Sequence, residues 1–256
     1  MATTGTEPAS AGPAVVMRGY VPLPTDDFQT YLENVNDAAD TTIAFTVGIT
    51  NAAAGATIYY DHHEDGFEAD IANPVQSTTL VFGDGNAGNG NAGTYCTACA
   101  GDLLPQGAPL VMRSSIPTPR VPANRFFDGG DKVASTRGIT ITAGGYSTPL
   151  NSVLSGVVSA YDTSKYGTRY TVPVGEDTPF PSGTTDAFSY TGASIMASTA
   201  GTVVDIDDDG DGDVDTTATI DEGRTHLANG GLSEGATITS SAPVQVHLLT
   251  GRRLSD

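Results

Sequence analysis

Short β-prone segments recur along most of the sequence, and this recurrence limits the fold more than any other feature. The segments are rich in Val, Ile and Thr, and turn residues separate them; the chain holds 31 Gly and 15 Pro. One segment alternates strictly, with the apolar residues of one face at Ile43, Phe45, Val47 and Ile49. Many short strands at regular spacing are typical of sandwiches and barrels. We therefore predict an all-β fold of two tandem β-sandwich units, Ig-like or jelly-roll-like.

One stretch near the N-terminus has helical periodicity instead. Its apolar residues recur at i, i+3, i+4 and i+7, on one side of a helix, and they are Phe28, Tyr31, Leu32 and Val35. Thr25 or Asp26 can cap the start of such a helix. The sequence thus predicts at most one short helix.

A weak internal repeat suggests two units. Residues 55–66 run parallel to 201–210, and 130–144 resemble 234–251, in the same order. A chain of 256 residues is also near the size at which one hydrophobic core gives way to two.

The repeat divides the chain into three parts. Residues 1–20 are a lead-in with a possible first strand, and 21–148 form the first sandwich, enlarged by a glycine- and cysteine-rich loop at 83–101. Residues 149–256 form the second sandwich. The glycine-rich part of the insertion is too poor in side chains to hold a strand, so we expect a flexible surface loop there.

Seven carboxylates and two glycines fall within residues 205–215, between two β-prone runs at 202–206 and 216–220. Calcium takes six to eight oxygen ligands from a chain that bends around it, so alternating carboxylates and a glycine at the sharp turn suit it. The flanks are β-prone rather than helical and no glutamate closes the loop, which excludes an EF-hand. We predict a calcium loop at a hairpin tip; an unoccupied acidic turn is the alternative.

Two registers of that loop fit calcium. The first uses Asp205, Asp207 and Asp209 before Gly210, and Asp211 and Asp213 after it. The second uses Asp207, Asp209 and Asp211 before Gly212, with Asp215 closing the loop. Together they give six candidate ligands: Asp205, Asp207, Asp209, Asp211, Asp213 and Asp215.

A second polar cluster occupies the corresponding position in the first half. Its candidate ligands are Asp61, His62, His63, Glu64, Asp65 and Glu68. In an extended chain the two adjacent histidines point to opposite faces, so they cannot hold one ion without a tight turn. The cluster is a possible second metal site, and solvated surface residues are the alternative.

Cys96 and Cys99 are the only cysteines of the chain. A zinc ribbon needs a second such pair, and a thioredoxin-like site needs a βαβ context. We predict a local disulfide that pins the glycine-rich loop, with two free thiols as the alternative.

Charge and hydropathy exclude several classes of partner. The formal net charge is −19, with eleven Lys and Arg, so electrostatic binding to nucleic acid or to an anionic membrane is not expected. No apolar run approaches the length needed for membrane insertion, and the Met1 start shows no signal peptide. We expect a fragment or a mature form whose partners are calcium and other protein surfaces or glycans.

Several long phrases occur in order between residues 20 and 251. They are Tyr59-Tyr-Asp-His-His-Glu-Asp-Gly-Phe-Glu68, Phe82-Gly-Asp-Gly85, Asp128-Gly-Gly-Asp-Lys132, Tyr166-Gly-Thr-Arg-Tyr-Thr-Val-Pro-Val-Gly-Glu-Asp177 and Ala242-Pro-Val-Gln-Val-His-Leu-Leu-Thr-Gly251. Together they resemble a module of large secreted or surface proteins of bacteria, which is similar in turn to the N-terminal repeats of IgGFc-binding protein. The resemblance implies an extracellular or cell-surface location, tandem β-sandwiches in a longer adhesive chain, and no established catalytic residues. The sequence departs from that family at His63, where a Trp usually stands.

The sequence also lacks the usual arrangements of a catalytic site. No serine lies in a G-x-S-x-G elbow, and the aspartates gather on one turn instead of facing each other across a cleft. We therefore predict a non-catalytic, calcium-stabilised structural or adhesive module. A carbohydrate-binding module, supported by Tyr59, Tyr60 and Phe67, is one alternative, and a metal-dependent hydrolase that uses Asp61 to Glu64 is another.

Overall fold

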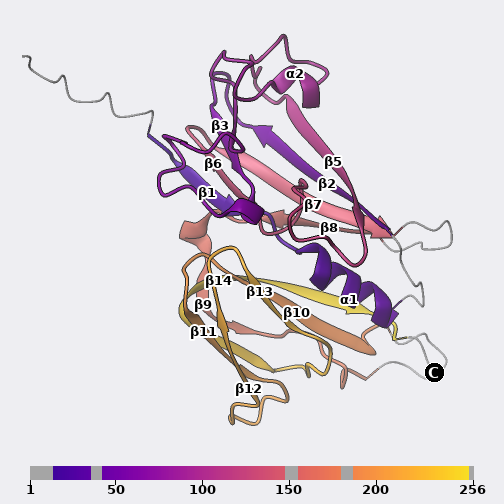
Figure 1. Ribbon diagram of the computed structural model, residues 1–256. Helices are drawn as coiled ribbons and strands as arrows, with labels where there is room; N and C mark the ends of the chain where they lie inside the picture. Colours follow the sequence, from indigo (N-terminus) through magenta and orange to yellow (C-terminus); the bar gives the residue numbers. More distant parts are fainter. Residues whose placement is uncertain (1–13, 36–41, 148–154, 180–186, 254–256) are drawn as a thin grey trace, which may run out of the picture.

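The computed structural model describes residues 14–35, 42–147, 155–179 and 187–253. Its described part is built mainly of antiparallel strands in three sheets, which confirms the predicted all-β class (Figure 1). The two β units lie one above the other in Figure 1, with a helix between them.

The first unit is a sandwich of two four-stranded sheets. The first sheet has the order β1-β6-β3-β4, with β1 at Met17–Tyr20, β6 at Lys132–Ser135, β3 at Ile58–Asp61 and β4 at Leu80–Phe82. The second sheet has the order β5-β2-β7-β8, with β5 at Pro109–Pro117, β2 at Thr42–Asn51, β7 at Ile139–Ser147 and β8 at Ser155–Ala160.

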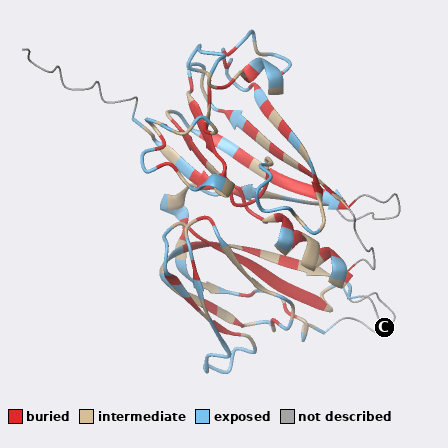
Figure 2. Cartoon of the chain, viewed as in Figure 1, coloured by how far each residue is buried: buried red, intermediate tan, exposed pale blue. Residues whose placement is uncertain are grey.

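The inward faces of the two sheets share one hydrophobic core. Along β2, buried residues alternate with residues that are partly exposed, as the period of two predicts (Figure 2). Phe45 and Ile49 of β2 pack in the same cluster as Ile58 and Tyr60 of β3. This burial of alternate side chains fixes the register of the strands, because a shift by one residue would turn the apolar face to solvent.

The second unit is a six-stranded sheet that folds around its own core. Its order is β12-β11-β14-β10-β13, with β9 paired to β14, and the strands are β9 at Gly167–Thr171, β10 at Tyr190–Ala197, β11 at Thr202–Asp207, β12 at Thr216–Ile220, β13 at Thr225–Ala228 and β14 at Thr237–Gly251. The early part of β14 pairs with β11, and its later part pairs with β10. An irregularity between Thr239 and Val244 lets this one strand serve both halves of the unit.

The boundary between the units lies later than the sequence predicts. The predicted boundary at 148–149 falls outside the described residues, but β8 pairs with β7 over Ser155 to Ala160. That strand therefore belongs to the first unit, because sheet pairing and not the apparent repeat decides membership. The second unit begins after Ala160.

The predicted helix is confirmed as α1, Thr25–Val35, and it lies at the junction of the units (Figure 1). Phe28 and Leu32 pack in the core of the first unit, and the same cluster includes Tyr190 and Leu249 of the second unit. The Tyr31 hydroxyl donates to the carbonyl oxygen of Thr250 at 2.9 Å. The helix therefore joins the two units through apolar and polar contacts at once.

Three further short helical turns occur in the described residues. They are α2 at Ala92–Tyr95 and two 3-10 turns at His63–Asp65 and Thr163–Lys165. The turn α2 lies in the insertion that we predicted as a flexible loop, where the Asp102 carboxylate accepts the backbone N–H groups of Gly83, Gly85 and Ala92. No helix in the described residues is long and apolar enough to cross a membrane.

Candidate functional site

The acidic stretch forms the loop of a β-hairpin, as predicted. Strands β11 and β12 pair from Thr202 opposite Ile220 to Ile206 opposite Thr216, and the loop covers residues 208–215. Two positive φ angles, 77° at Gly210 and 101° at Gly212, let the backbone turn there at low cost.

Three carboxylates of this loop come together. Oxygen atoms of Asp207, Asp209 and Asp215 all lie within 4.8 Å of one another. Asp207 accepts the N–H groups of Gly210 at 2.7 Å and Gly212 at 3.1 Å, which fixes its carboxylate under the turn. The group corresponds to the second predicted register, which closes at Asp215.

The remaining predicted ligands of the loop lie outside that group. Asp205 accepts a hydrogen bond from the Thr217 hydroxyl at 2.6 Å, and Asp211 and Asp213 are exposed. Partial burial and the neighbouring Asp215 raise the pKa of Asp208. That shift reflects the concentration of negative charge around the loop.

The second predicted cluster lies elsewhere, at the junction of the units, and its centre is a residue that the sequence did not single out. Asp131 is fully buried and accepts hydrogen bonds from the Tyr60 hydroxyl at 2.6 Å and from the backbone N–H of His63 at 3.1 Å. The backbone N–H of Asp128 also donates to it, at 3.3 Å. Burial by itself raises the pKa of Asp131. Hydrogen bonds from His62 and His63 outweigh this effect and lower the pKa from its ordinary value to about 2.

Both histidines approach this one carboxylate, because a tight turn begins between them. His62 keeps an extended backbone, and the 3-10 turn starts at His63. Nδ1 of His62 lies 3.4 Å from Asp131 Oδ2, and Nδ1 of His63 lies 3.1 Å from Asp131 Oδ1. The turn that the two side chains needed is therefore present.

The two histidines nevertheless have different surroundings. Nδ1 of His62 lies 3.0 Å from the carbonyl oxygen of Phe126, which can only accept a hydrogen bond, so this nitrogen carries a proton. The His62 ring packs against Tyr60 and Phe127, with centroids 5.2 Å apart in each pair. Burial lowers the pKa of His62, but its contact with Asp131 outweighs this and raises it. His62 is thus held on both its polar and its aromatic sides.

Arg120 joins two further carboxylates of the cluster. Its guanidinium donates to Glu64 Oε1, and its Nε donates to Asp128 Oδ2 at 3.1 Å. The Thr25 hydroxyl also donates to Asp128 Oδ2, at 3.0 Å. Burial and the charge of Asp131 raise the pKa of Asp128 to about 7, although Arg120 lowers it. Negative charge therefore exceeds positive charge in this buried group.

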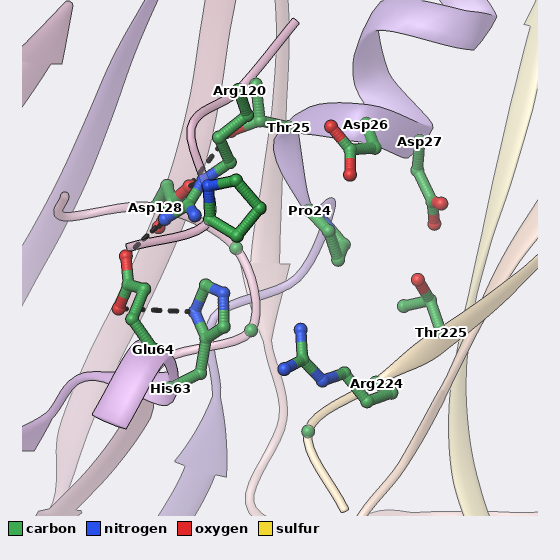
Figure 3. Close-up of a pocket in the computed structure, with 14 residues that line it drawn as sticks. Pro24, Thr25, Asp26, Asp27, His63, Glu64, Arg120, Asp128, Arg224 and Thr225 are labelled. Atoms are coloured by element: carbon green, nitrogen blue, oxygen red, sulfur yellow. Dashed lines mark hydrogen bonds and ion pairs between the residues drawn. The ribbon is translucent and has the colours of Figure 1, made fainter. Parts of the chain in front are cut away.

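A cavity of about 440 Å³ lies beside the cluster and is lined by both units and α1. His63, Glu64 and Asp128 line one side, and Asp27 lines another (Figure 3). The second unit contributes Arg224, whose guanidinium points toward His63 in Figure 3. Polar groups of both signs thus surround the cavity.

The other predicted members of this cluster lie apart from it. The buried Asp61 carboxylate accepts a hydrogen bond from the backbone N–H of Glu68 at 2.8 Å. The Thr79 hydroxyl lies 3.2 Å from the Asp61 carboxylate and 3.2 Å from the Glu68 carboxylate. Asp65 forms a surface ion pair with Arg125 at 3.4 Å. Asp61 and Glu68 thus brace the chain after β3, and the sequence-based set of six separates into three groups.

Arg120, Asp128 and Asp131 are the site residues that sequence reasoning missed. The phrase Asp128-Gly-Gly-Asp131 holds a usable signal, because two carboxylates flank a pair of glycines. A Cβ atom at Gly129 would lie 2.3 Å from the backbone of Leu23 and Pro24, so only glycine permits that approach. Asp128 and Asp131 therefore flank the point where the backbone at Gly129 lies close to the chain just before α1.

Cys96 and Cys99 form the predicted disulfide, with an S–S distance of 2.04 Å. The neighbouring Tyr95 packs edge to face on Phe127, at a centroid distance of 5.3 Å. Phe127 in turn contacts His62. Ring contacts thus link the cysteine loop to the junction cluster, which consists of His62, His63, Glu64, Arg120, Asp128 and Asp131.

Comparison of the chain with family models, curated proteins and solved structures finds no match. The geometry of the two clusters therefore gives the main indication of function, and each of them could hold a metal ion.

Proposed function

We propose that the chain is a non-catalytic structural or adhesive module of a secreted or surface protein of bacteria, stabilised by calcium at the β11–β12 loop. The observation that carries the proposal is the convergence of Asp207, Asp209 and Asp215. Among the described residues, no lysine, arginine or histidine forms an ion pair with any of the three. Their mutual repulsion is relieved when a cation binds.

Calcium suits this group for three reasons. All three ligands are oxygens, which calcium prefers, and they stand on a loop whose remaining carbonyl groups and water can complete six to eight positions. The spacing of the three residues follows the pattern of a calcium loop that closes at Asp215. The turn is pinned by the N–H groups that Gly210 and Gly212 donate to Asp207, so part of the ordering is present before binding.

A structural role is supported by the way the units are joined. The Gln245 side chain donates to the carbonyl oxygen of Tyr20 at 3.1 Å, and Glu222 accepts from the hydroxyl of Tyr20 at 2.5 Å and from Lys132 at 2.7 Å. Together with α1, these contacts tie the two units together. We infer that the hairpin loop stiffens one end of a two-unit module.

The disulfide supports an extracellular location. Disulfides persist in oxidising compartments and are rare in the cytosol, so the Cys96–Cys99 pair fits a secreted or surface protein. The strongly acidic composition fits the same setting, where calcium is abundant enough for weak extracellular sites.

The carbohydrate-binding alternative loses its main support in the structure. Tyr60 is fully buried and Tyr59 is 3% exposed, so neither ring can offer a face to a sugar. Phe67 packs edge to face on Tyr20, at a centroid distance of 5.7 Å. The aromatic residues that suggested a glycan surface therefore serve the core.

A thermal melt in calcium and in chelator tests the proposal. At a calcium concentration 100 times the Kd, a ligand that binds only the native state adds about 2.7 kcal/mol, which for a chain of this size corresponds to roughly 5 to 10 °C in Tm. The double variant Asp207→Asn and Asp209→Asn should lose this shift, while Glu33→Gln, an exposed control on α1, should keep it. Identical melting curves for the native protein in both conditions would sink the proposal.

A further inference from the structure

The two histidines of the junction cluster differ in their access to the cavity, because His63 lines it and His62 does not. Nδ1 of His62 is committed to the carbonyl oxygen of Phe126, and the ring lies among aromatic residues. Nδ1 of His63 instead faces Asp131 Oδ1 at 3.1 Å, and His63 lines the cavity. Of the two overlapping groups of possible ligands, the one with His63, Asp128 and Asp131 is therefore the open one.

A carboxylate oxygen of Glu64 lies close to His63. The Glu64 side chain is only 2% exposed, and its buried Oε2 has no hydrogen-bond partner among the described residues. It lies 3.7 Å from His63 Nδ1, on the wall of the cavity (Figure 3). A buried carboxylate oxygen without a partner is costly, because it has lost its water without gaining a donor.

Arg120 contacts Glu64 and Asp128 each mainly through one carboxylate oxygen, and its contact with the second oxygen of Asp128 is long. It binds Glu64 through Oε1 and Asp128 mainly through Oδ2, at 3.1 Å, while Asp128 Oδ1 is 3.5 Å away. Such outer contacts are the usual means of orienting metal ligands. When Glu64, Asp128 and Asp131 are all ionised, their three carboxylates and the Arg120 guanidinium leave two net negative charges, which a divalent cation balances.

We propose that His63, Asp128, Asp131 and Glu64 bind a divalent transition metal, of which Zn²⁺ fits best, at the wall of the junction cavity. One imidazole nitrogen with carboxylate oxygens is a set that zinc accepts and that calcium, which prefers oxygen alone, does not favour. Zinc ligands at bond lengths near 2.1 Å stand about 3.4 Å apart in a tetrahedron. The His63 distances of 3.1 Å to Asp131 and 3.7 Å to Glu64 lie on either side of that value.

This site is separate from the hairpin loop and does not depend on the calcium proposal. Its ligands come from the first unit alone, but the cavity beside it reaches Arg224 and Thr225 of the second unit. A bound metal would hold together the 3-10 turn after β3 and the Asp128–Asp131 loop. The cavity leaves room for water or a small oxygen ligand to reach it.

Titration of the protein with Zn²⁺ or Co²⁺ tests the assignment, in an Asp207→Asn and Asp209→Asn background so that the hairpin cannot contribute. One equivalent should bind, and Co²⁺ should develop visible absorption bands of a four-coordinate site with nitrogen and oxygen ligands. His63→Gln and Asp128→Asn should each weaken binding at least about tenfold. His226→Gln, outside the cluster, should bind as the background does. His62→Gln keeps a donor for Phe126 but loses the contact with Asp131, so it should weaken binding less than His63→Gln does.

Two results would overturn the proposal: no bound equivalent, which would leave only an ion-paired cluster, or equal losses in the His62 and His63 variants. If the His63 and Asp128 variants fail to fold, crystals of the native protein soaked in Zn²⁺ decide the matter. Anomalous scattering at the zinc edge should then mark an ion between His63 and Asp128. A peak elsewhere, or none, overturns the assignment.

Discussion

The hairpin loop and the junction cluster are both rich in carboxylates, but the negative charge is compensated in different ways in the two regions. The carboxylates of the hairpin come from nine successive residues, and Asp209 and Asp215 are exposed. Those of the junction come from loops 64 positions apart, and Asp128 and Asp131 are at most 1% exposed. Hairpin charge is screened by water and ions, whereas junction charge depends on Arg120, Tyr60 and backbone donors.

The difference shows what each cluster contributes. A group on a single loop can lose its cation without leaving another segment of the chain unpaired, so the loss costs only the binding energy. A buried group whose donors come from several segments holds those segments together, and the loss of one member leaves others without partners. The junction should therefore dominate stability, and the hairpin should dominate the response to calcium.

The largest expected effect is that of Asp131→Ala. The substitution removes the acceptor for Tyr60, His63 and Asp128 in a fully buried site, so we expect the free energy of unfolding to fall by about 3–5 kcal/mol. Urea denaturation followed by circular dichroism measures it. Asp65→Asn, in the surface pair with Arg125, is the control and should cost under about 1 kcal/mol. A loss at Asp131 no larger than the control would contradict the comparison.

The same contrast explains what the sequence could predict. The hairpin could be predicted because its strands and ligands are local: the runs at 202–206 and 216–220 are β-prone, and the turn between them holds the glycines that it needs. The helix could be predicted for the same reason, since its periodicity is local. Its predicted cap at Thr25 or Asp26 was wrong: the helix begins at Thr25, the carbonyl oxygen of Pro24 accepts from the N–H of Phe28, and the Thr25 hydroxyl donates to Asp128.

Only part of the junction cluster could be predicted from the sequence. His62, His63 and Glu64 are visible as a cluster, but their partners come from a loop that pairing of β3 with β6 brings beside them. Strand β6 is only four residues long and comes shortly after a glycine pair, so its sequence shows no clear period of two. Strand β13 shows none either, because it mixes polar with apolar residues. Without β6, nothing in the sequence places Asp131 next to His63.

A smaller effect should appear as acid sensitivity at another contact between the units. His247 on β14 stacks on Tyr161, which follows β8, at a centroid distance of 6.1 Å and an angle of 12°. Its Nε2 is buried without a hydrogen-bond partner among the described residues, and burial lowers the pKa of His247 to about 4. Protonation is therefore easier in the unfolded chain, and the native state loses stability when pH falls.

The sign and range follow from that shift. The contribution of neutral His247 is complete above the ordinary pKa of about 6.5 and is lost as pH falls from there through about 4, up to on the order of 3 kcal/mol. Urea denaturation from pH 8 to pH 4 should show this slope in the native protein relative to a His247 variant, because the raised pKa values of Asp128 and His62 act in the opposite direction in both proteins. His247→Phe, which keeps a ring against Tyr161, should flatten it while changing stability little at pH 8. Parallel curves would show that this histidine is not the origin of the acid sensitivity.

The smallest effect, and the one that separates the clusters most directly, is that of Asp209→Asn. Asp209 is exposed and stands among like charges, so without calcium the variant should differ by at most about 0.5 kcal/mol and lean toward greater stability. In excess calcium the sign should reverse, because the native protein gains binding energy that the variant forgoes. Urea denaturation of both proteins in chelator and in calcium measures this reversal. Asp65→Asn should give the same small difference in both solutions. If Asp209→Asn were destabilising by the same amount with and without calcium, the hairpin carboxylates would be structural in the way that those of the junction are, and the contrast between the clusters would fail.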